Sequence, residues 1–121
     1  MTLSEIRDEM NALWASADRE ADSLKDPFLA MERVQTAYRA FEPLERAHVE
    51  EVLAEWVLSE DEAKRFDAIA VVRELGVVSA TPALRSLEAR LRQSDDPGAP
   101  FEREKVSDVL SELGAGGTAP A

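Results

Sequence analysis

Two segments of this chain end in the same tripeptide, Glu-Leu-Gly, and the interval between them constrains the fold more than any other feature. The first copy ends at Gly76 and the second at Gly114, which is a step of 38 residues (114 − 76). Apolar residues recur with the same step: Ala68 with Val106, Val71 with Val109, Val72 with Leu110, and Leu75 with Leu113. Such a period indicates stacked helix pairs, because each pair buries its apolar face only against the next one. The sequence therefore predicts an all-α fold, an α-α superhelix (solenoid) of about three antiparallel helix pairs, with six helices.

Prolines divide the chain into these helices. Pro27, Pro43 and Pro82 each suit the first turn of a helix, where a missing N–H breaks no hydrogen bond. Asp26 is a suitable N-cap for the helix that follows it. Apolar residues then recur at helical spacing after each start. The expected elements are three pairs over about residues 3–41, 43–75 and 81–113, forming one domain (1–113), and a disordered low-complexity tail (114–121).

Capping signals agree with these boundaries. Thr2 precedes Glu5, and Ser59 precedes Glu62, at the spacing of a capping box. Gly76 suits a left-handed C-cap, because glycine adopts a positive φ without a steric penalty. These signals predict where individual helices begin and end.

The aromatic residues are expected to belong to the core. Trp14, Tyr38, Trp56 and Phe66 fall on apolar stripes at helical spacing. This pattern is more typical of packing than of a platform on which nucleic-acid bases stack. Leu24, Phe28 and Leu44 continue the same stripes and are expected to be covered as well.

The charge of the chain indicates what kind of partner it binds. There are 25 acidic and 14 basic residues, for a formal net charge of −11. Phosphate backbones and anionic lipid surfaces are repelled by such a balance, so we expect neither nucleic-acid nor membrane binding, but a protein partner with a basic face. Along the helices, opposite charges are spaced four apart, as in Glu42 with Arg46, Arg46 with Glu50, and Asp61 with Arg65.

Composition also predicts a cytoplasmic protein. The chain contains no cysteine, which fits a reducing compartment. No apolar run approaches the length of a membrane span, and the first residues lack the pattern of a signal peptide.

We expect no catalytic residue, metal site or cofactor. His48 is the single histidine, so no pair of histidines is available to bind a metal, and we expect an ordinary surface or half-buried role for it. No glycine precedes Gly76, so the helical region has no phosphate-binding loop. The pairs Asp18–Asp22 and Glu5–Glu9 are expected to be solvated acidic faces.

Two stretches of the chain resemble HEAT repeats. Pro82-Ala83-Leu84 begins a first helix, Asp95-Asp96 lies in a turn, and Lys105 to Gly114 forms a second helix that ends near glycine. Residues 49–76 look like another copy, with residues 59–62 as the turn. The resemblance implies a right-handed stack of antiparallel helix pairs, with a concave face lined by the second helices and used mostly to bind proteins.

The predicted partner-binding surface is the polar strip on these second helices. Its residues are Glu32, Gln35, Arg39, Lys64, Asp67, Glu74, Lys105 and Glu112. The function predicted with it is that of a non-enzymatic protein–protein interaction module, one version being an acidic inhibitor or immunity protein that neutralises a basic partner. The alternative is an enzyme or enzyme accessory subunit of the HEAT-like lyase type. A homo-oligomer stays open, as does a binding site on the outer helices around Asp18 and Asp22.

Overall fold

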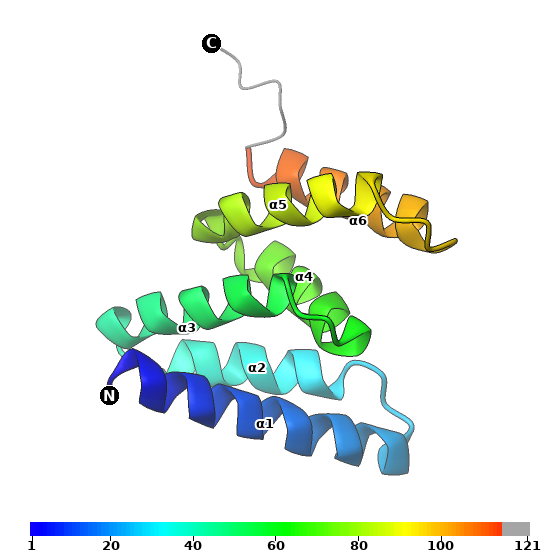
Figure 1. Ribbon diagram of the computed structural model, residues 1–121. Helices are drawn as coiled ribbons and strands as arrows, with labels where there is room; N and C mark the ends of the chain where they lie inside the picture. The colour runs from blue at the N-terminus through cyan, green and yellow to red at the C-terminus, as the bar shows by residue number, and fades with distance from the viewer. Residues whose placement is uncertain (115–121) are drawn as a thin grey trace. The chain divides into compact units, whose positions relative to one another are not determined.

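A computed structural model describes residues 1–114, and in this range all regular secondary structure is helical, with no strand (Figure 1). It contains six α-helices and one turn of 3-10 helix. They are α1 (Leu3–Leu24), α2 (Leu29–Ala40), α3 (Pro43–Val57), α4 (Glu62–Leu75), η1 (Val78–Ala80), α5 (Thr81–Arg92) and α6 (Ala99–Glu112). The all-α class and the six helices are as predicted. The expected disordered tail lies outside the described residues, apart from Gly114.

The chain forms two compact units. The first, Met1–Leu53, contains α1, α2 and most of α3. The second begins at Ala54 and contains the end of α3 followed by α4, η1, α5 and α6. The boundary therefore falls within α3, a helix that the sequence places whole in the middle pair.

The first unit is built on an antiparallel hairpin of α1 and α2 (Figure 1). Apolar residues on α1 recur at steps of three and four, so they form one stripe that faces the neighbouring helix. The side chains that the hairpin buries are Ile6, Met10, Trp14 and Ala17 of α1 and Ala30 and Val34 of α2.

Polar contacts connect α2 to the following helix. The Arg46 guanidinium donates hydrogen bonds to the carbonyls of Tyr38 (3.1 Å) and Arg39 (2.8 Å), which are among the last carbonyls of α2. The Tyr38 hydroxyl donates to Glu50 Oε2 at 2.8 Å. Burial, together with this carboxylate, raises the pKa of Tyr38. Arg46, predicted to pair along its own helix, thus caps the C-terminus of α2.

The start of α1 has the predicted capping box. Thr2 Oγ1 accepts a hydrogen bond from the Glu5 N–H at 3.1 Å, and Glu5 Oε1 accepts one from the Thr2 N–H at 2.9 Å. Hydrogen bonds from the Thr2 backbone and hydroxyl lower the pKa of Glu5 below its ordinary value of 4.5. The ionised Glu5 carboxylate therefore stabilises the folded state at pH values above the pKa that Glu5 has in the unfolded chain. This stabilisation is lost as the pH falls through the lower pKa of Glu5 in the folded chain.

We expect Thr2→Ala to raise the pKa of Glu5 toward 4.5, because the hydroxyl that completes the box is removed. An NMR titration of the Glu5 carboxyl measures this shift. Ser16→Ala, an exposed change further along α1, is the matched control and should leave the titration unchanged. The backbone N–H of residue 2 is kept in this variant, so an unaltered Glu5 titration would show that the Thr2 hydroxyl does not contribute to the lowered pKa.

Two other predicted helix starts are wrong by a few residues. Asp26 does not cap a helix that begins at Pro27. Its carboxylate accepts the Phe28 N–H at 3.0 Å in a turn, and α2 begins at Leu29. Asp61, rather than Ser59, is the N-cap of α4, and it accepts the Lys64 N–H at 3.2 Å. In both places an aspartate or serine side chain closes a local turn instead, a competing use of the same residue types.

The second unit has an apolar core formed by α4, α5 and α6. Helices α5 and α6 run antiparallel, and α4 packs against α6 (Figure 1). The predicted stripes supply the buried side chains, which are Ala68, Ile69, Val71 and Val72 of α4, Leu84, Leu87 and Leu91 of α5, and Val106, Val109 and Leu110 of α6. Gly76 ends α4 with φ 66°, as the C-cap prediction requires.

Several apolar side chains that were expected in the core are exposed. Trp14 and Trp56 are buried and Tyr38 is half-buried, but the exposed fraction of Phe66 is 54%. Leu24, Phe28 and Leu44 are also exposed. These three lie at helix ends. Phe66 is different, since it lies within α4.

Candidate functional site

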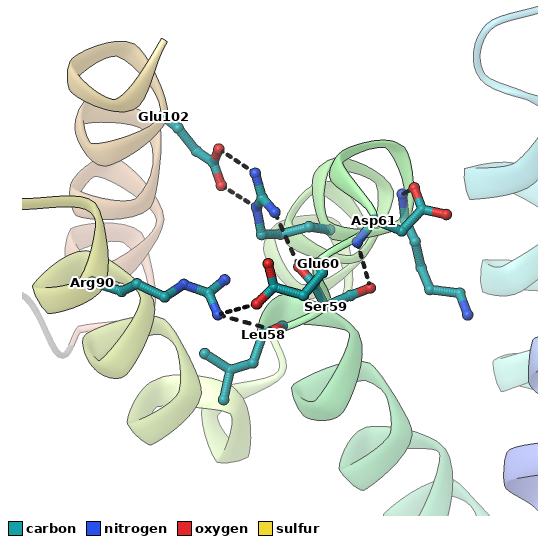
Figure 2. A network of polar contacts seen from close by, with 8 residues as sticks. Leu58, Ser59, Glu60, Asp61, Arg90 and Glu102 are labelled. Carbon is teal, nitrogen blue, oxygen red and sulfur yellow. Dashed lines mark hydrogen bonds and ion pairs between the residues drawn. The ribbon is translucent and has the colours of Figure 1, made fainter. Parts of the chain in front are cut away.

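Helices α4 and α6 are joined by a partly buried ion pair. Arg65 Nε and Nη2 donate to the two carboxylate oxygens of Glu102, at 2.5 and 2.8 Å (Figure 2). The third nitrogen, Nη1, donates to the Ser59 carbonyl at 3.0 Å, so all three guanidinium nitrogens are used. The side chains are only 13% and 21% exposed. The pKa of Arg65 is raised, mainly by its hydrogen bonds to Glu102, so the guanidinium stays charged.

A second ion pair joins the C-terminal halves of the same helices. Arg73 Nη2 donates to Glu112 Oε1 at 2.8 Å, and Arg73 Nε lies 2.6 Å from Glu112 Oε2. Since Arg65 precedes Arg73 on α4 and Glu102 precedes Glu112 on α6, the two helices run parallel. In the sequence, Arg65 and Glu102 are 37 residues apart, and Arg73 and Glu112 are 39 residues apart. Both separations are within one residue of the 38-residue step.

The parallel arrangement places two phenylalanines on one side of the helix pair. Successive residues in an α-helix are turned by about 100°. Because Arg65 and Glu102 point toward each other, the residue after Arg65 and the residue before Glu102 turn to the same side. These residues are Phe66 and Phe101, whose exposed fractions are 54% and 76%.

On the same side as the two phenylalanines, polar residues follow toward the C-terminal ends of α4 and α6. Arg73 follows Phe66 by about two turns, while Lys105 and Glu112 follow Phe101 by about one and three turns. The Arg73–Glu112 pair is about half exposed, as expected for side chains on the same exposed side of α4 and α6 as the two phenylalanines. We call this surface the α4–α6 face, and it consists of Phe66, Arg73, Phe101, Lys105 and Glu112.

In the second unit, the residues of the polar strip predicted from the sequence do not all lie on one surface. Lys105 and Glu112 belong to the α4–α6 face. Asp67, two positions after Arg65, is turned by about 200° from it and so points away from α6, and Glu74 lies on the same side two turns later. Lys64 Nζ lies 5.2 Å from the centre of the Trp56 ring, a cation–π contact with α3.

The three remaining strip residues lie on α2, in the first unit. Glu32 and Arg39 are exposed, and Gln35 is half-buried. The continuity of the strip from these residues to those of the second unit stays a prediction.

The residues considered for chemistry are dispersed. His48 is half-buried, with Nδ1 3.8 Å from Glu51 Oε2. No group of three or more histidine, aspartate or glutamate residues within residues 1–114 is arranged to hold a metal ion. None of the helices in the same range combines the length and apolar character needed to cross a bilayer.

Four residues of the site were not found by sequence reasoning. Arg65 was paired with Asp61 on its own helix, whereas it binds Glu102, and Asp61 is a helix cap. Arg73, Phe101 and Glu102 were not singled out. One signal was available: Arg65 and Glu102 are oppositely charged and their separation is close to the 38-residue step, at which a stack of helix pairs would bring them together.

Comparison of the chain with protein-family models, curated protein sequences and solved structures gave no match. The site is therefore interpreted from its own geometry.

Proposed function

We propose that this protein is a non-enzymatic protein-binding module of HEAT-like repeats, which recognises a partner with a basic face. The observation that carries the proposal is the pairing of α4 with α6. Residues about one sequence period apart meet across two parallel helices, through Arg65–Glu102 and Arg73–Glu112. This is the contact that stacked repeats make, and stacks of this kind present extended surfaces to other proteins.

The surface chemistry supports a protein ligand. Phe66 and Phe101 expose large apolar side chains within ordered helices, and exposed apolar groups that gather on one face typically mark interaction sites. The net charge of −11 favours a basic partner, because opposite charge accelerates association and disfavours acidic competitors. A narrower form of the proposal is an acidic inhibitor or immunity protein, which covers a basic surface that its partner uses to bind phosphate.

Affinity capture with the full chain tests this function. We expect immobilised protein to retain one basic protein from a cell extract, and the complex to re-form from the two purified components. Its dissociation constant should rise between low and moderate salt, because salt screens the charges that bring the partners together. An unrelated acidic helical protein of similar net charge is the control, and it should not retain the same partner.

Failure to reconstitute any complex would contradict the proposed function. So would a complex with an acidic protein whose affinity is independent of salt. The first result would contradict the proposed binding role. The second would contradict the proposal that charge complementarity selects the partner.

A further inference from the structure

Phe66 and Phe101 form an exposed aromatic pair on a fixed support. The Arg65–Glu102 ion pair lies between the two helices at the level of the rings, since each phenylalanine is the sequence neighbour of one member of the pair. Arg65 is also bonded to the Ser59 carbonyl, which holds the start of α4 (Figure 2). The aromatic pair is therefore preorganised, and little conformational entropy is lost when a ligand covers it.

Acidic turns lie at the same end of the helices as the aromatic pair. Residues 58–61 precede α4 and residues 93–98 precede α6, and Phe66 and Phe101 lie within the first two turns of these helices. The two turns contain four carboxylates and no basic side chain: Glu60, Asp61, Asp95 and Asp96. All four residues are exposed, and Glu60 is 95% exposed even though Arg90 lies 3.6 Å from it.

From this juxtaposition we infer that the aromatic pair is the anchoring site for a basic amphipathic segment of the partner protein. An aliphatic or aromatic side chain of that segment covers Phe66 and Phe101, and its lysine or arginine side chains contact the acidic turns. The inference deepens the proposed function and rests on it, because it names the part of the surface that binds and the chemistry of the ligand. Large aromatic or aliphatic anchors near the centre of an interface dominate the affinity of many complexes.

Two other occupants fit the surface less well. In a second copy of the chain the same acidic turns would approach one another, and like charges in an interface are unfavourable. Residues 115–121 of this chain contain only alanine, glycine, threonine and proline, so they have no large apolar side chain to cover two phenyl rings.

A synthetic peptide probe tests the inference directly. The probe is a helical peptide with leucine on one face and lysine on the other, and its companion has alanine in place of leucine. We expect the leucine–lysine peptide to bind the full chain, and Phe66→Ser with Phe101→Ser to raise its dissociation constant about tenfold or more. The alanine–lysine peptide should bind weakly and be insensitive to this change.

Three further variants separate the chemical contributions. Leu44→Ser with Val78→Ser removes two other exposed apolar side chains and should leave binding unchanged. Glu60→Gln with Asp95→Asn should weaken binding most at low salt, because it removes charge from both acidic turns. Asp67→Lys with Glu74→Lys changes the side of α4 that points away from α6 and should have the smaller effect. Unchanged melting temperatures exclude unfolding as the cause of any loss.

Several results would overturn the inference. They are absence of peptide binding by the unaltered chain, equal losses in the phenylalanine and Leu44/Val78 variants, and a larger loss in the Asp67/Glu74 variant. A dimer of the unaltered chain that the phenylalanine changes dissociate would identify a second copy as the occupant. If the protein partner from affinity capture binds the phenylalanine variant as tightly as the unaltered chain, the inference fails while the proposed function stands.

Discussion

Leu87→Ala is expected to lower the free energy of unfolding by about 2–5 kcal/mol. Leu87 is a fully buried residue of α5, in the core of the second unit. Truncation removes apolar surface from the core and leaves a cavity that close-packed neighbours fill only in part. Chemical denaturation monitored by circular dichroism measures the loss.

Leu44→Ala provides the matched control for this prediction. It makes the same chemical change at a residue that is 86% exposed, and we expect a change within about 0.5 kcal/mol. A loss below about 1 kcal/mol for Leu87→Ala would mean that α5 does not pack as described.

Glu102→Gln should destabilise the second unit by about 1–3 kcal/mol. The substitution keeps the shape of the side chain but removes its charge, so the Arg65 guanidinium, only 13% exposed, loses a bidentate anionic partner. Thermal and chemical unfolding of the full chain give the size of the effect. It should persist at moderate salt, because partly buried pairs are screened less than exposed ones.

Glu112→Gln is the matched control on the same two helices. The Arg73–Glu112 pair is about half exposed, so its loss should change the free energy of unfolding by no more than about 1 kcal/mol, and less at higher salt. Equal losses for the two substitutions would contradict the distinction between a partly buried pair and an exposed one. If Glu102→Gln had no effect, the ion pair could not be what supports the aromatic pair.

The sequence predicted the helices well because helix formation depends on local patterns. The capping box at Thr2, the proline start at Pro43 and the left-handed C-cap at Gly76 all lie where the sequence places them. The wrong starts, at Asp26 and Ser59, arise where one residue type has two local uses. A side chain that caps a helix in one conformation closes a turn in another, and the two differ by one or two residues.

The candidate site was predicted only in part. Lys105 and Glu112 were placed correctly on an exposed surface of α6, since the periodicity of a single helix indicates which residues point away from the core. Periodicity also placed Phe66 in the core, because seven apolar residues follow one another closely in α4 and the pattern does not show which of them the neighbouring helices cover. In the structure α6 covers one flank of α4, and Phe66 lies beyond it.

By itself, the sequence determined the all-α class, the six helices, most of their ends and the strongly acidic character of the chain. All of these depend on residues within a few positions of one another or on composition alone. The tertiary structure decided that Arg65 binds Glu102 instead of Asp61, that the two ion pairs hold α4 and α6 parallel, and that Phe66 and Phe101 share an exposed face. The physical reason is that these contacts join residues 35 or more positions apart, and their geometry depends on the direction and rotation of two packed helices, which no local pattern specifies.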